Sequence, residues 1–274
     1  MSSVLVLWEF LRRDTKIALS YRLSAILQVA AMFSLAVTFF FLSLMMQGVE
    51  GKIPSLARYG GSYFAFSLVG LAVSLYVEAS LRSFSMSVRT AQITGTFEAM
   101  LVTRTPIGLV VLGSALYSLT YTALRSVILL GLGALVFQMP LYLHEWPTLI
   151  VVVGLTVSST MALGIFSAGF IVLFKQGDPL TSAISGLSWL LSGVLYPKEI
   201  LPLPVQELAR VLPMTHALEA LRQLLLLGAP PSTVDGSIVG LFVFSAAGLP
   251  LSLVWFAWSV RRARVAGSLS LIHI

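Results

Sequence analysis

Long apolar runs separated by short polar segments are the dominant pattern along this chain. A helix needs about 20 apolar residues to cross the hydrocarbon core of a bilayer. The pattern predicts six such helices, at about residues 23–46, 61–81, 107–137, 148–174, 180–195 and 237–260. We therefore expect an all-α membrane protein with six transmembrane helices, organised as a single domain over residues 1–268.

Two segments depart from the pattern of simple spans. Residues 4–22 mix apolar with charged positions, which is typical of an amphipathic helix at the membrane interface. In residues 196–236, prolines interrupt the helical pattern, and Pro213 separates two short helical stretches. Apolar runs such as Leu224–Leu227 are unfavourable in water. We expect a re-entrant helical hairpin on the extracytoplasmic side, with an ordinary loop packed on head groups as the alternative.

The composition agrees with membrane insertion. Hydrophobic residues make up 57% of the chain and charged residues 10%, against about 25% charged in soluble domains. Eleven Lys and Arg lie on the side of the membrane that holds the two termini, and five lie on the other side. The excess of positive charge places both termini in the cytoplasm, and we expect the protein in the cell membrane of a prokaryote. The net charge of +6 fits this orientation and contact with membrane lipids, and we expect no nucleic acid partner.

The sequence shows no constellation for catalysis. Cysteine is absent, none of the four lysines lies in a phosphate-binding loop, and His144 and Glu145 lack the second histidine of a helical metal motif. We therefore expect no catalytic residue, no metal site and no cofactor in this chain. ATP-driven work would require a separate polypeptide.

The loop between the second and third spans carries a recognisable motif. Thr96 is suited to cap a helix with Glu98 in its first turn. The segment resembles the Gly-Thr-apolar-Glu-x-apolar-Leu-x-Thr-Pro pattern of type-2 ABC exporter permeases, although the proline comes later here. The resemblance implies that these residues couple the chain to an ATPase: Gly95, Thr96, Phe97, Glu98, Leu101 and Thr103.

The segment between the fifth and sixth spans resembles the same family. The pattern is Ser-Gly, aromatic-Pro, Leu-Pro, Pro-x-Thr and a final Ala-Leu-Arg, with Leu212 in place of a common Asn and His216 in place of a common aromatic residue. The resemblance implies a hairpin at the exit of a transport pathway. Its residues are Gly193, Tyr196, Pro197, Pro202, Pro213, Thr215, His216, Leu221 and Arg222.

By this resemblance, the chain is expected to be the permease of an ATP-driven exporter for a drug, lipid or lipid-linked glycan. The expected partners are an ABC ATPase subunit, which carries ATP and Mg, and a second permease copy in a homodimer or a paralogous heterodimer. Haem or polysaccharide export also stays open. The alternatives are an ATP-independent carrier or scaffold and, less favoured, a membrane-embedded enzyme.

A few polar and small residues lie at membrane depth. Arg125 either lines the pathway or has a structural role, and the sequence favours neither. Glu78 and Arg82 are spaced to form an ion pair, and Gln28 is suited to join two helices. Small residues in the third and fourth spans, among them Gly131, Gly133, Gly154, Ser158, Gly164 and Gly169, predict close helix packing within one chain or between two.

The last residues, 269–274, match the translation of an adapter used in sequencing libraries. We expect this tail to be non-native and exclude it from the fold.

Overall fold

The computed structural model describes residues 8, 11–12, 15–16, 22–50, 54–93, 95, 107–174 and 178–265. Within these ranges the regular structure is helical, as predicted. The elements are α2 (Arg22–Glu50), α3 (Pro54–Ala57), α4 (Tyr63–Ile93), α6 (Ile107–Leu135), α7 (Trp146–Phe174), α8 (Asp178–Leu191), the 3₁₀ helix η1 (Lys198–Ile200), α9 (Leu203–Arg210), α10 (Pro213–Leu227) and α11 (Pro231–Val265). The predicted interfacial helix (4–22) lies mostly outside the described residues, and the tail (269–274) lies entirely outside them.

Five helices in the described part of the chain are long and apolar enough to cross a membrane: α2, α4, α6, α7 and α11. The predicted fifth span (180–195) corresponds to α8, which has 14 residues. At about 1.5 Å per residue this helix is about 21 Å long, less than the roughly 30 Å of a bilayer core. The helix stops because Gly193 adopts a left-handed conformation, with φ +72°. The count of six spans therefore stays a prediction.

The helix that contains the predicted second span is longer than that span. We predicted that it ends at Leu81 and that a polar stretch follows, but α4 continues as one helix to Ile93. The helix continues because the residues after Leu81 keep a buried face, which includes Phe84 and Val88. Where the membrane span ends within this helix stays a prediction.

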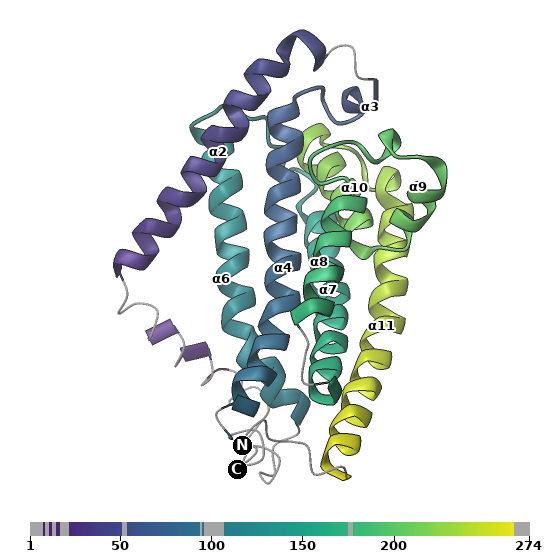
Figure 1. The fold of residues 1–274 in the computed structure, drawn as a ribbon. Helices are drawn as coiled ribbons and strands as arrows, with labels where there is room; N and C mark the ends of the chain where they lie inside the picture. The colour runs from purple at the N-terminus through teal and green to yellow at the C-terminus, as the bar shows by residue number, and fades with distance from the viewer. Residues whose placement is uncertain are drawn as a thin grey trace.

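The helices form a bundle with α4 at its centre (Figure 1). Helices α6 and α7 pack on α4, α11 packs along α7, and α2 leans away from α6. The short helices α3, α9 and α10 gather at one end of the bundle, which we call the hairpin end. One core cluster joins α10 to α4 there, and a second, around Phe84, Leu119 and Ile165, joins α4, α6 and α7 toward the opposite end.

Three of the predicted small residues allow close approach within this chain. A Cβ atom on Gly133 would lie 2.3 Å from Leu68 Cδ2, and one on Gly164 would lie 2.6 Å from the Ser80 carbonyl oxygen. A Cβ on Gly169 would lie 2.6 Å from Trp255 Nε1. By contrast, a Cβ on Gly131 or Gly154 would meet nothing within 4 Å.

Buried hydroxyl groups connect the short α8 to its neighbours. Ser167 Oγ on α7 lies 3.0 Å from Ser85 Oγ on α4 and 2.6 Å from Thr181 Oγ1 on α8. Ser85 and Thr181 also contact each other, at 3.2 Å. Hydrogen bonds between side chains are a common means of joining helices in membranes, where apolar burial gives no selectivity.

Candidate functional site

The segment between α8 and α11 folds into two helices at the positions that the prolines predict. Pro202 precedes α9, Pro213 is the first residue of α10, and Gly228 ends α10 in a left-handed conformation. Proline is favoured in the first turn of a helix because its missing N–H would have no helical partner there. Much of α10 is buried, including Ala217 and Leu218, so this helix is part of the bundle core. We refer to η1, α9 and α10 together as the hairpin.

Arg222 holds the hairpin to the bundle. Its side chain is almost fully buried, and it donates to the carbonyl oxygens of Gly193 at 2.9 Å, Val194 at 2.7 Å and Phe66 at 3.3 Å. The guanidinium carbon also lies 3.4 Å from the centre of the Phe66 ring. A cation over an aromatic face is stabilised most when both groups are desolvated. Arg222 thus joins α10 to α4 and to the turn that follows α8, and we call this set of contacts the Arg222 clamp.

Burial lowers the pKa of Arg222 to about 9, while Tyr59 and Glu199 oppose this effect. A pKa of about 9 leaves the guanidinium charged at neutral pH. Its charge is therefore available to strengthen the hydrogen bonds to the three carbonyl groups.

Two glycines make room for the clamp. A Cβ atom on Gly70 would lie 2.1 Å from the Val194 carbonyl oxygen and 2.7 Å from Arg222 Nη2. Gly193 has φ +72°, a conformation that glycine adopts without steric cost. Sequence reasoning included Gly193 but missed Gly70, because its neighbours Val194 and Arg222 are distant in the sequence.

The other predicted hairpin residues have structural contacts. Thr215 Oγ1 lies 2.6 Å from the Ala209 carbonyl oxygen and 3.1 Å from Ser192 Oγ, which connects α10 to both α9 and the end of α8. His216 Nε2 lies 2.9 Å from the Arg210 carbonyl oxygen. A Cβ on Gly240 of α11 would lie 2.8 Å from the His216 ring. The structure thus brings these residues together as a packed unit.

The residues around the turn after α8 complete that unit. The Tyr196 hydroxyl donates to the Leu190 carbonyl, and Pro197 is buried. Lys198 forms an ion pair with Glu219 on α10, and Arg58 Nη1 lies 3.9 Å from Glu199 Oε1. These contacts connect η1 to α10 and to the α3–α4 connection.

The predicted ATPase-coupling loop is described at one residue. Gly95 has φ +68°, and its N–H donates to the Gln92 carbonyl oxygen at 3.3 Å, which turns the chain at the end of α4. The remaining predicted residues, Thr96, Phe97, Glu98, Leu101 and Thr103, lie outside the described residues. Their role stays a prediction.

The polar residues predicted at membrane depth differ in whether their side chains have a hydrogen-bond or ion-pair partner. Glu78 and Arg82 form the predicted ion pair, with Arg82 Nε 3.1 Å from Glu78 Oε1. Gln28 joins α2 to α6, as predicted, because the Tyr121 hydroxyl donates to its Oε1 at 2.7 Å. Arg125 lies one turn further along α6, with its Nε buried and without a hydrogen-bond partner among the described residues.

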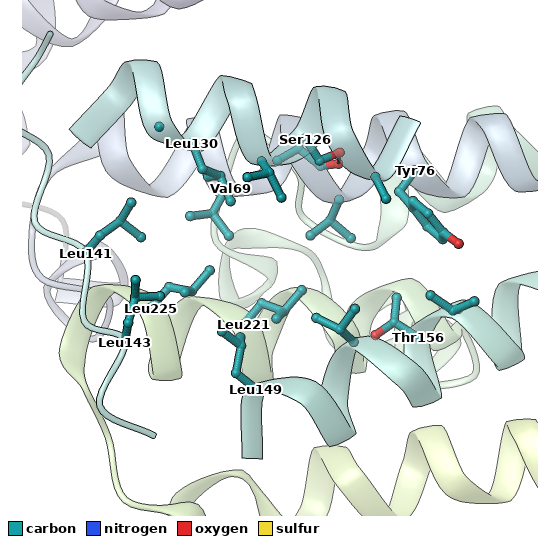
Figure 2. A pocket seen from close by; sticks show the side chains of 17 residues that line it. Val69, Tyr76, Ser126, Leu130, Leu141, Leu143, Leu149, Thr156, Leu221 and Leu225 are labelled. Atoms are coloured by element: carbon teal, nitrogen blue, oxygen red, sulfur yellow. Dashed lines mark hydrogen bonds between the residues drawn. The ribbon is translucent and has the colours of Figure 1, made fainter. Parts of the chain in front are cut away.

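Beneath the hairpin lies an apolar groove (Figure 2). Its floor is the part of α4 from Val69 to Tyr76, and its walls are α6 and α7. Leu221 and Leu225 of α10 lie at the hairpin end, and the groove encloses about 390 Å³. Figure 2 shows side chains from opposite walls pointing toward one another across the open space. Leu221, one of the predicted hairpin residues, thus lines a cavity that is bordered by three of the long apolar helices.

Comparison with known proteins gives two results. The sequence profile of the family described as ABC-2 type transporter matches residues 6–226, a range that includes both motif-bearing segments. Nodulation protein J of Rhizobium leguminosarum bv. trifolii is 29% identical over 183 residues, which cover 62% of this chain and 65% of that protein. Nodulation protein J of Rhizobium meliloti (strain 1021) is 28% identical over 182 residues, which cover 62% of this chain and 64% of that protein. The matched region thus spans slightly less than two thirds of these relatives.

Proposed function

This chain belongs to the ABC-2 type transporter family, a family of membrane transport permeases, and from that premise we propose that it is the permease subunit of an ATP-driven exporter. It would work with a separate ATPase subunit and move a hydrophobic or amphipathic substrate out of the cytoplasm. The family match over residues 6–226 is the observation that carries this proposal.

The described structure supports a transport role through the hairpin. Here Arg222 connects α10 to the turn after α8, and the hydroxyls of Ser85, Ser167 and Thr181 connect α8 to α4 and α7. Movement of α4 or α8 would therefore be transmitted to the hairpin.

The proposed cycle uses these connections. Two permease copies enclose a pathway, and two ATPase subunits close on ATP at the cytoplasmic side. Closure acts on the loop that contains Thr96, Glu98 and Leu101, which follows directly on α4. Because α4 is one helix from Tyr63 to Ile93, it runs from that loop to the Arg222 clamp. The substrate class would be a drug, a lipid or a lipid-linked glycan.

Cross-linking tests the contact with the ATPase. The chain has no cysteine, so Leu101→Cys provides a single reactive thiol without further mutations. A thiol- and amine-reactive cross-linker in native membranes should join this variant to a protein with a phosphate-binding ATPase motif, identified by mass spectrometry. Leu208→Cys is the matched control, because Leu208 is 61% exposed on the hairpin and belongs to the opposite side of the membrane in the proposed topology. Capture of no ATPase by Leu101→Cys, or equal capture by both variants, would contradict the coupling assignment.

A further inference from the structure

The apolar groove beneath the hairpin is closed at both ends. At the hairpin end, Leu141 and Leu143 lie over it, and the Tyr142 N–H holds their segment to α10 by donating to the Leu225 carbonyl oxygen at 2.8 Å. At the other end, α4, α6 and α7 come together in the core cluster around Phe84, Leu119 and Ile165. Access is therefore from the side, between α6 and α7.

The sideways opening faces the surroundings of the spans. Val127 on α6 and Val153 on α7 both line the groove, and they are 67% and 44% exposed. Because α6 and α7 are long and apolar enough to cross a membrane, we expect this opening to face lipid. A groove that opens into lipid and is shut toward both ends of the bundle suits a bound lipid chain better than a substrate in transit.

The chemistry of the lining also selects an apolar ligand. The described lining contains no charged side chain, and its three hydroxyl groups already have partners within the protein. Ser126 donates to the Ala72 carbonyl oxygen at 2.8 Å, Thr156 donates to that of Val152 at 2.8 Å, and Tyr76 has Ser80 as its partner. The volume of about 390 Å³ falls in the range of ligand pockets, about 300–1,000 Å³. The groove can therefore bind hydrocarbon but gives no polar recognition of a head group.

We propose that this groove is a binding site for one acyl chain of a phospholipid from the leaflet at the hairpin end. The chain enters between α6 and α7 and packs against Leu221 and Leu225. Both residues are on α10, the helix that carries Arg222, so the bound lipid braces the hairpin from below. The proposal depends on membrane insertion and is independent of export.

Photolabelling tests this site. The full chain is placed in lipid nanodiscs with a phospholipid that carries a diazirine near the end of one acyl chain, and labelled peptides are mapped by mass spectrometry. We expect labelling of residues 123–131 and 149–157 to exceed, several-fold, that of the exposed face of α11 at Val239, Phe242 and Val243. Labelling of the groove no higher than that of α11 would indicate bulk lipid contact alone and would overturn the proposal. A groove protected from label, as when a second copy of the chain fills it, would overturn it as well.

A matched pair of glycine variants adds a second test. Gly131 lines the groove and Gly154 is not part of its lining, while a Cβ on either meets nothing within 4 Å. Gly131→Leu fills the groove and should abolish the excess labelling, whereas Gly154→Leu should retain it. Unchanged labelling of Gly131→Leu would refute the site. If Gly131→Leu fails to fold, the comparison of the groove with α11 in the unmodified chain still decides. No ATPase is present in these samples, so the result leaves the proposed function untouched.

Discussion

Replacing Arg222 with methionine removes the clamp while keeping a side chain of similar reach. The substitution leaves the carbonyl groups of Gly193, Val194 and Phe66 without their donor. Hydrogen bonds to a charged group contribute about 1.5–3 kcal/mol each, and a desolvated cation–π contact contributes about 2 kcal/mol. These contributions are not additive, and methionine also avoids the cost of burying a charge. We therefore expect a net loss of about 3–5 kcal/mol, comparable to breaking a buried ion pair.

Hydrogen exchange in nanodiscs measures this loss where it acts. The amides of α10 should lose protection by about two to four orders of magnitude in Arg222→Met, because about 1.4 kcal/mol corresponds to a factor of ten. Arg222→Lys keeps the charge but not the planar group with several donors, so its loss should be intermediate.

Arg210→Met is the control for removing a positive charge from the hairpin. Arg210 is exposed and pairs with Glu207 at 2.7 Å, and exposed pairs of this kind contribute about 0–1 kcal/mol. Equal protection of α10 in Arg222→Met and Arg210→Met would refute the clamp.

Two further substitutions test packing around the hairpin. Gly70→Ala places a Cβ 2.1 Å from the Val194 carbonyl oxygen, so we expect thermal unfolding to show a loss of about 1–3 kcal/mol or more in the free energy of unfolding. Gly154→Ala is the control, because its Cβ meets no atom within 4 Å and the substitution should be neutral or stabilising. Equal unfolding temperatures of the two variants would contradict the close approach. Ser167→Ala removes the hydroxyl shared by Ser85 and Thr181, and unfolding in a bilayer-mimetic medium should show a loss of about 0.6 kcal/mol. Ser182→Ala, at an exposed position of α8, should show no loss, and a similar loss in both variants would exclude a special role for the hydroxyl cluster.

The long helices were predictable because their signal is local. Apolar runs of sufficient length located α2, α4, α6, α7 and α11, and the division of the hairpin into two helices followed from the position of Pro213. The end of α8 was harder to predict, because the apolar run continues to Leu195 while the helix stops at Leu191. A left-handed glycine at Gly193 ends the helix, and hydropathy does not detect it.

The role of Arg222 could not be read from the sequence. The pattern placed it at the end of a family motif and gave no indication of its contacts. In the structure, it is buried because unpaired carbonyl groups at the end of α8 and an aromatic ring on α4 meet at its position. The groove could not be predicted from the sequence either, since it depends on how far apart three helices pack. By contrast, the pairing of Glu78 with Arg82 depends on spacing along one helix and was predicted correctly.

ATP hydrolysis by a reconstituted complex tests the proposed export function most directly. The chain is placed in nanodiscs with the ATPase captured by Leu101→Cys, and hydrolysis is compared for the unmodified chain, Glu98→Lys and Glu207→Lys. Glu98 is in the predicted coupling loop, and Glu207 is a 64% exposed carboxylate on the hairpin. The two variants therefore make the same charge reversal at different places in the chain. We predict that the unmodified chain and Glu207→Lys alter the ATPase rate several-fold and that Glu98→Lys does not. An ATPase rate that is the same with and without the chain would contradict the assignment as an ATP-driven exporter permease.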